Sequence, residues 1–348
     1  MTEAPSVPKN RAGLTKAEYR GGKSTLCPGC GHDAITSSIV EAAFDYGVDP
    51  ERVVKLSGIG CSSKTPAYFL GRSHGFNAVH GRMPSVATGT FAANRTLVPI
   101  GVSGDGDTAS IGMGQFVHLV RRNVPCVYLI ENNGVYGLTK GQFSATADVG
   151  SLQKGGRKNE LPPIDCCAIA IELGCGFVAR SFSGDPKQLR PILKAAFAFP
   201  GTSVIDIVSP CVTFNDHEGS TKSYDYAKEH DEPLHLIGFV PFWEHTEVEI
   251  APGEVKDVEM PDGSRLRLQK IKTEYDPSDR LEAMRVIHEA RAAGRLVTGV
   301  LFLDPKKRTF AEEFDLVEEP LATLPEERVR PSRKALEEIL QGFRVGSA

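Results

Sequence analysis

The sequence predicts an α/β protein in which a parallel sheet is flanked by helices. Residues 97–103 and 124–131 are apolar runs of the length of buried strands. A glycine-rich turn at 104–107 and a helix expected over 108–122 separate them, which predicts a right-handed βαβ unit. The same alternation is expected on both sides of this unit, with strands at 53–56, 176–181 and 202–209 and helices at 33–46, 165–173 and from Asp185–Pro186 onward.

The 348 residues divide into three expected regions. Residues 1–24 have the mixed composition of a flexible arm. Residues 25–215 carry the α/β pattern and the motifs described below. Residues 216–348 are highly charged and are expected to form a C-terminal extension that docks on the main domain or on a partner subunit. It should contain a hairpin near 261–263, a helix at 277–294 and a strand at 296–303.

Charge and hydropathy exclude several classes of protein. There are 40 basic and 44 acidic residues, a net charge of −4, which argues against a nucleic-acid binder and a polybasic membrane-surface protein. No apolar run is long enough to span a membrane. The first twenty residues lack the apolar core of a secretory signal. We therefore expect a cytoplasmic location, where the eight cysteines favour a metal, a cluster or core packing over disulfides.

The turn Gly104-Asp105-Gly106-Asp107-Thr108-Ala109 allows two interpretations. It matches a dinucleotide-binding pattern, so NAD binding is one alternative. However, Asp105 and Asp107 would repel a diphosphate unless a divalent cation lay between them. Mg²⁺ commonly bridges protein oxygens to substrate phosphates.

Asn133 supplies the second part of this expected magnesium site. It follows the next strand, 28 residues after Asp105. Adjacent parallel strands end at the same edge of a sheet, so the two segments should meet there. The amide oxygen of Asn133 and the carbonyl oxygen of Val135 are candidate ligands. The alternative is a pair of ordinary turns.

Three cysteines lie in glycine-rich turns. Cys27 and Cys30 belong to the motif CPGCGH (27–32), and Cys61 belongs to GIGCSSK (58–64). A zinc site would need a second close pair of Cys or His residues, and the sequence contains none, so zinc is not favoured. A ligand set made of one C-x-x-C pair and single cysteines from distant loops is typical of an iron–sulfur cluster. The alternative is that Cys27 and Cys30 are a buried structural pair that binds no metal.

The GDG turn followed by Asn132-Asn133 resembles the thiamine diphosphate motif, which implies Mg²⁺ held by Asp105, Asn133 and Val135. CPGCGH, GIGCSSK, HGRMPSVATG (80–89), GDGD and ENNGVYGLTKGQ (131–142) occur in this order. Together they resemble the β subunits of 2-oxoacid:ferredoxin oxidoreductases over about residues 20–215.

This resemblance implies a thiamine-diphosphate-binding fold and a set of site residues. A [4Fe–4S] cluster would be held by Cys27, Cys30, Cys61 and Cys211. Thiamine diphosphate would contact Ile59, Gly60, Cys61, Ser62, His80, Gly106, Asp107, Gly137 and Leu138. Lys64 would face the 2-oxoacid and Lys140 the coenzyme A. The remaining cysteines lie in apolar contexts and are expected in the core: Cys126, Cys166, Cys167 and Cys175.

The implied reaction is the reversible, coenzyme A-dependent oxidative decarboxylation of 2-oxoglutarate to succinyl-CoA and CO₂, with electrons passing through the cluster to ferredoxin. The thiamine carbon is the nucleophile, so no residue is assigned as catalytic. No segment marks the glutamate that thiamine enzymes use beside the pyrimidine, which implies that an α subunit brings the pyrimidine-binding module. A lysine after GCSS fits a dicarboxylic substrate. The alternatives are pyruvate or broad 2-oxoacid specificity, a non-redox carboligase, and a non-catalytic zinc- or NAD-binding module.

Overall fold

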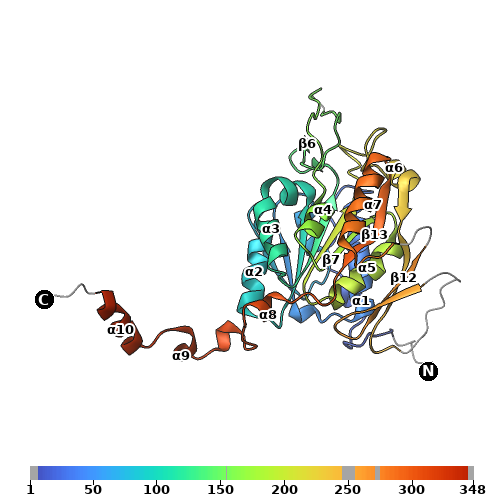
Figure 1. Cartoon of the computed structure of the whole chain (residues 1–348). Helices are drawn as coiled ribbons and strands as arrows, with labels where there is room; N and C mark the ends of the chain where they lie inside the picture. Colours follow the sequence, from blue (N-terminus) through green and yellow to red (C-terminus); the bar gives the residue numbers. More distant parts are fainter. Residues whose placement is uncertain (1–6, 154, 245–254, 271–274, 344–348) are drawn as a thin grey trace.

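An eight-stranded sheet forms the centre of the molecule, with strand order β2-β1-β3-β4-β8-β7-β13-β9 (Figure 1). The computed structural model describes residues 7–153, 155–244, 255–270 and 275–343. The strands of the large sheet are β1 (Val53–Ser57), β2 (His74–Asn77), β3 (Val98–Gly104), β4 (Cys126–Asn132), β7 (Phe177–Phe182), β8 (Thr202–Val208), β9 (Asp231–Pro233) and β13 (Leu296–Leu303).

Helices cover both faces of this sheet and create two apolar cores. One core contains α1 (Gly31–Tyr46) and α5 (Pro186–Ala198). The other contains α2 (Met83–Ala93), α3 (Met113–Arg121), α4 (Cys166–Glu172) and α7 (Arg280–Ala292). The central strands supply both cores by simple alternation. Val127 and Leu129 belong to the first core, whereas Tyr128 and Ile130 belong to the second. The expected α/β fold with a sheet flanked by helices is confirmed, and the sheet is parallel except where β13 pairs antiparallel with β7.

Local signals in the sequence account for the helix boundaries. Helix α1 ends where Gly47 adopts a left-handed conformation, with φ of 69°. Helix α5 begins as predicted, because the Asp185 side chain accepts from the backbone of Lys187 and Gln188. The single helix expected at 108–122 is instead divided. A π-helical turn spans Gly106–Ile111, and α3 starts after Gly112.

The position between the two helical segments requires glycine. A Cβ built on Gly112 would lie 2.6 Å from the carbonyl oxygen of Asp107, and 3.0 Å from the backbone of Gly81. The chain passes too close to the loop before α2 to accommodate a side chain at this point. Strand β2 and helix α2 were not anticipated, because residues 58–90 lack clear periodicity.

The region after residue 215 contributes to the same sheet. Strand β13 pairs antiparallel with β7, and β9 pairs parallel with β13. The expected hairpin is present as β11 (Val255–Glu259) and β12 (Arg265–Lys270), which form a three-stranded sheet with β10 (His235–Val240). A short hairpin pairs β5 (Val135–Tyr136) with β6 (Gln142–Phe143).

The remaining helices are α6 (Tyr224–His230), α8 (Phe310–Glu313), α9 (Glu326–Val329) and α10 (Arg333–Phe343). In Figure 1, α9 and α10 lie away from the body of the protein, at the red end of the chain. Among the described residues, no helix combines the length and the apolar character needed to cross a membrane.

One buried histidine makes stability depend on pH. His235 is 2% exposed, and neither ring nitrogen has a hydrogen-bond partner among the described residues. Burial lowers the pKa of His235 from 6.5 to about 4. In the unfolded chain His235 takes up a proton near pH 6.5, whereas in the folded chain it does not. The contribution of neutral His235 to the free energy of unfolding is therefore full above pH 6.5 and is lost as the pH falls towards 4.

We expect His235→Phe to reduce this pH dependence. Phenylalanine preserves the edge-on contact with Tyr275 and takes up no proton on unfolding. In urea denaturation, the free energy of unfolding of the variant should fall less steeply between pH 7 and pH 5 than that of the wild type. In the wild type, His235 should contribute a slope that approaches about 1.4 kcal/mol per pH unit. The exposed His288→Gln serves as the control. An unchanged slope in His235→Phe would contradict the assignment.

Candidate active site

The segments that follow β1, β3 and β4 meet at the carboxyl edge of the sheet. Gly104 at the end of β3 pairs with Glu131 in β4, so the chain segments starting at Asp105 and Asn133 lie side by side. Strand β1 is the other neighbour of β3 and brings the loop after Ser57 to the same place. These segments enclose a cavity of about 80 Å³. Open α/β sheets bind their ligands at this edge.

The residues expected to hold thiamine diphosphate and Mg²⁺ all line this cavity. They are Ile59, Gly60, Cys61, Ser62, His80, Asp105, Gly106, Asp107, Asn133, Val135, Gly137 and Leu138. The two lysines expected to face substrates do not line it. Lys64 lies half-buried in the 3-10 turn Ser62–Ala67, and Lys140 is exposed, with a left-handed φ of 83°. The gathering of the cavity residues is observed, whereas their roles as ligands stay predictions.

Asp105 has one oxygen engaged and one nearly free. Its Oδ2 accepts hydrogen bonds from the hydroxyls of Ser144 and Thr146, the latter at 2.5 Å. Its Oδ1 accepts only a long bond of 3.3 Å from the Asn133 backbone among the described residues. Burial raises the pKa of Asp105, because water cannot solvate the carboxylate. A divalent cation at Oδ1 would supply the missing favourable charge, so this residue fits a magnesium ligand.

Asn133 is held in a turn that leaves its side-chain oxygen available. The amide oxygen accepts from the Val135 backbone at 3.0 Å, and an amide oxygen has a second lone pair. Gly134, with φ of 74°, turns the chain between them. The Asn133 carbonyl oxygen accepts from Asn215 at 2.8 Å. These contacts hold the Asn133 side chain in a defined position, and Asn133, Val135 and Asp105 all line the same cavity.

Asp107 joins the loops around the cavity. Its Oδ1 is hydrogen-bonded to the His80 ring and accepts from the backbone of Gly81 at 2.7 Å and of Ile59 at 3.3 Å. Its Oδ2 accepts from the Ser103 hydroxyl at 2.8 Å. A Cβ on Gly58 would lie 2.2 Å from the Asp107 carboxylate, so only glycine permits this approach. Asp107 thus ties the loops after β1 and β2 to the end of β3.

A thiol group, defined here as Cys27, Cys30, Cys61 and Cys211, lies next to the cavity. None of them is in a disulfide. A Cβ built on Gly137 would lie 3.5 Å from the sulfur of Cys61 and 3.6 Å from that of Cys211.

Electrostatics link the same thiols. Burial raises the pKa of Cys30 to about 12, with smaller contributions from nearby groups that include Cys211 and Cys61. The pKa values of Cys61 and Cys211 are also raised, by burial first and by the Cys27 thiol in smaller part. The structure therefore brings together all the cysteines expected to hold a cluster.

No three His, Cys, Asp or Glu side chains in the described part of the chain are arranged to hold a single metal ion. A [4Fe–4S] cluster is bound by thiolates spread around several atoms, so its ligands stand further apart. The thiol group has the composition that such a cluster requires. The cysteines expected in the core are all buried there: Cys126, Cys166, Cys167 and Cys175.

Two polar residues at the site, Glu131 and His32, belong to the family motifs but were not among the residues expected to bind thiamine diphosphate. Glu131 and His32 line the cavity and are fully buried, 3.6 Å apart, and Thr65 donates to Glu131 at 3.0 Å. Burial raises the pKa of Glu131 well above its ordinary range and lowers that of His32 to about 4. One Glu131 oxygen and the Ser62 hydroxyl have no hydrogen-bond partner among the described residues. Unpartnered buried polar atoms in a cavity are consistent with a bound polar ligand.

Comparisons with known proteins agree with this site. Residues 58–207 match the family described as thiamine pyrophosphate enzyme, C-terminal TPP binding domain. Residues 265–319 match the family of C-terminal regions of the pyruvate ferredoxin oxidoreductase beta subunit. A 2-oxoacid:ferredoxin oxidoreductase subunit beta from Saccharolobus solfataricus is 41% identical over 222 residues, covering 63% of this chain and 70% of the relative. The chain belongs to the 2-oxoacid:ferredoxin oxidoreductase β-subunit family.

Further relatives of this β-subunit family extend the similarity. The 2-oxoglutarate oxidoreductase subunit KorB from Mycobacterium tuberculosis is 35% identical over 244 residues, 66% of this chain and 65% of the relative. A solved 2-oxoglutarate:ferredoxin oxidoreductase from Magnetococcus marinus, with 2-oxoglutarate, coenzyme A and succinyl-CoA bound, matches with a TM-score of 0.73 and 27% identity. That match covers 97% of this chain and all of the other. The thiamine-diphosphate-binding fold expected from the motifs is confirmed.

The Asp107 hydrogen bonds generate a prediction for this β subunit. Asp107→Asn removes the charge and one acceptor oxygen, so the loops at 58–62 and 80–81 lose part of their anchor. We expect a loss of about 1–3 kcal/mol in the free energy of unfolding and faster proteolysis within these loops. Urea denaturation and mass spectrometry of the cleavage products measure both effects. The exposed Asp45→Asn is the control and should change neither; equal behaviour of the two variants would refute the anchoring role.

Proposed function

We propose that this β subunit, together with an α subunit, catalyses the coenzyme A-dependent oxidative decarboxylation of 2-oxoglutarate to succinyl-CoA and CO₂, with ferredoxin as the electron acceptor. The observation that carries the proposal is the shared wall between two sites. Cys61 lines the expected diphosphate cavity and also belongs to the thiol group. Gly137 lines the same cavity and lies against the sulfurs of Cys61 and Cys211. A redox centre directly beside a thiamine site suits decarboxylation coupled to electron transfer.

The residues of this chain bind and orient the cofactors in the proposed reaction. Asp105, Asn133 and the carbonyl oxygen of Val135 would hold Mg²⁺, which neutralises the diphosphate. Cys27, Cys30, Cys61 and Cys211 would hold a [4Fe–4S] cluster. When bound, thiamine diphosphate would supply the carbon nucleophile for decarboxylation, and the cluster would supply one-electron acceptance.

The loops around the cavity position the diphosphate end of thiamine diphosphate. His80 lies against Asp107 and edge-on to Tyr136, with ring centroids 5.9 Å apart, so its ring is fixed at the cavity wall. Tyr136 also lines the cavity, and its hydroxyl donates to the Gly106 carbonyl oxygen at 3.1 Å. Glu131, which lines the cavity, lies in β4 two residues before the proposed magnesium ligand Asn133, and so on the proposed diphosphate side. We therefore assign the pyrimidine-side glutamate to the α subunit.

Substrate assignments rest on charge and on the relatives. Lys64 follows the GCSS segment and lies close to Cys61. Its positive charge slightly lowers the pKa of the Cys61 thiol, which burial raises. Its cation can receive the distal carboxylate of 2-oxoglutarate. Lys140 is exposed and directly follows Gly137, Leu138 and Thr139, which line the cavity, and it can receive a phosphate of coenzyme A. The KorB relatives and the solved neighbour are named for 2-oxoglutarate, which favours this substrate over pyruvate.

Anaerobic co-purification with the α subunit tests the proposed function. The complex should contain iron, sulfide and thiamine diphosphate, and should reduce a viologen dye only when 2-oxoglutarate and coenzyme A are present. In Cys211→Ser, iron and dye reduction should be lost. Cys175→Ala should retain both, because Cys175 is buried in the apolar core. Thiamine diphosphate without iron in the wild type would favour a non-redox carboligase.

The role of Lys64 has a separate test. Lys64→Ile removes the cation proposed to bind the distal carboxylate, so KM for 2-oxoglutarate should rise by about tenfold or more, the loss of one ion-assisted hydrogen bond. KM for pyruvate, which has no distal carboxylate, should change little. Steady-state dye reduction with each substrate measures the ratio. Equal effects on both substrates would overturn the assignment.

A further inference from the structure

A buried side-chain hydrogen bond joins the chain segments that carry Cys30 and Cys211. The Nδ1 of His32 and the Oγ of Ser209 lie 2.6 Å apart, and both residues are almost completely buried. His32 follows Cys30 by two residues, and Ser209 precedes Cys211 by two. The bond therefore lies between two of the cysteines expected to hold the cluster.

No other group competes for the proton of this hydrogen bond. Neither the His32 Nδ1 nor the Ser209 Oγ has a further hydrogen-bond partner among the described residues. The Glu131 Oε2 lies 3.6 Å from Nδ1, too far for a hydrogen bond, and accepts from the Thr65 hydroxyl instead. A neutral imidazole has one donor and one acceptor nitrogen, so either tautomer of His32 can complete the bond with a hydroxyl group.

The backbone beside this bond is packed too closely for a side chain. The Gly31 N–H donates to the Pro210 carbonyl oxygen at 3.2 Å. A Cβ built on Gly31 would lie 2.6 Å from the Ser209 Oγ and 2.9 Å from the Ser209 carbonyl carbon. The Thr213 hydroxyl lies 3.6 Å from the Cys27 sulfur and adds a contact between the same two parts of the chain. The start of α1 therefore rests directly on the segment that leads to the last cysteine of the thiol group.

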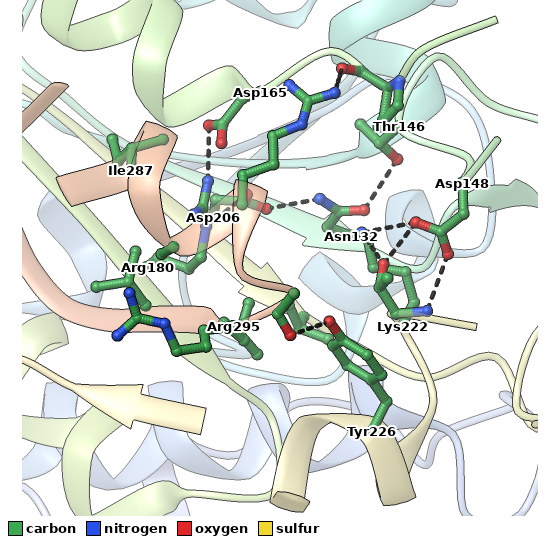
Figure 2. A pocket seen from close by; sticks show the side chains of 18 of the residues that line it. Asn132, Thr146, Asp148, Asp165, Arg180, Asp206, Lys222, Tyr226, Ile287 and Arg295 are labelled. Carbon is green, nitrogen blue, oxygen red and sulfur yellow. Dashed lines mark hydrogen bonds and ion pairs between the residues drawn. The ribbon is translucent and has the colours of Figure 1, made fainter. Parts of the chain in front are cut away.

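The sheet anchors the Ser209 side of this contact. Figure 2 shows a second cavity, of about 330 Å³, where Asp206 of β8 meets Arg180 and the Asn132 side chain. Asp206 lies 3.4 Å from the Arg180 Nε and accepts from the Asn132 Nδ2 at 2.9 Å. The Ser209 N–H donates to the Asn132 carbonyl oxygen at 2.8 Å, so β4 and β8 stay hydrogen-bonded up to Ser209. The hydrogen bond to His32 thus connects the start of a helix to a well-anchored strand end.

We propose that His32 and Ser209 are positioning residues for the [4Fe–4S] cluster, because their hydrogen bond holds the turn at 27–30 at a fixed distance from Cys211. The inference rests on the proposed function, which includes a cluster at the thiol group. Neither side chain supplies a ligand to the iron. Residues that orient metal ligands typically affect metal affinity although they do not touch the metal.

The test uses the complex with the α subunit, purified anaerobically with its cluster, and follows the loss of iron to a chelator. Ser209→Ala removes the hydroxyl, and iron should be lost about tenfold faster than from the wild type. His32→Leu should have a similar effect. The double variant should be no worse than either single variant, because each change breaks the same bond. His32→Asn keeps a hydrogen-bonding atom near the position of Nδ1 and should restore most of the iron retention.

Ser38→Ala is the matched control, because it removes another buried hydroxyl from α1, one that donates to the Ala34 carbonyl oxygen at 3.1 Å. It should lose iron at the wild-type rate. If His32→Leu does not fold, Ser209→Ala, which removes a single oxygen atom, decides the outcome. Unchanged iron loss in the folded Ser209→Ala variant, or an equal increase in Ser38→Ala, overturns the positioning role. A wild-type complex without iron would instead refute the proposed function, on which the inference rests.

Discussion

The parallel pairing of β3 with β4 is the constraint on which the site depends. Ile100 pairs with Val127 and Gly104 with Glu131, so both strands reach the sheet edge together. Because successive side chains alternate between faces, a slip of one residue would exchange the two cores. The apolar side chains on both faces therefore fix the register, and the register places Asp105 beside Asn133. Catalytic geometry here is a consequence of core packing some distance away.

Buried acidic groups at the strand ends organise the loops in turn. Asp105 and Asp107 are almost fully buried, a costly arrangement for carboxylates without partners. Hydroxyls and backbone amides from distant segments offset this cost, including Ser144 and Thr146 for Asp105, and Ser103 and Gly81 for Asp107. Each carboxylate thus draws a loop of little intrinsic order to a defined place. The weakly bonded Oδ1 of Asp105 is left for a cation, which would complete its coordination.

Sequence reasoning identified the parts of the site that belong to short, local patterns. The apolar runs predicted β3 and β4 to within one or two residues, and the five motifs that carry the family resemblance contained every residue expected to contact thiamine diphosphate. Thr146, Asp206 and Arg180 were missed because their hydrogen bonds and ion pairs join segments far apart in the chain. Nothing local distinguishes Thr146 in its long loop, or Asp206 in an otherwise apolar strand. Strand β9 was missed for the same reason, since it is only three residues long and is defined by its pairing with β13.

Gly137 and Cys61 show how closely the thiamine site and the thiol group adjoin. Both residues line the cavity, and a Cβ at Gly137 would be in van der Waals contact with the sulfurs of Cys61 and Cys211. Burial keeps these thiols protonated in the absence of metal, because their pKa values are raised. A neutral thiol tolerates burial, whereas a thiolate there needs the positive charge of iron. The sheet and its loops can therefore fold around uncharged cysteines, and binding of the proposed cluster would then release protons.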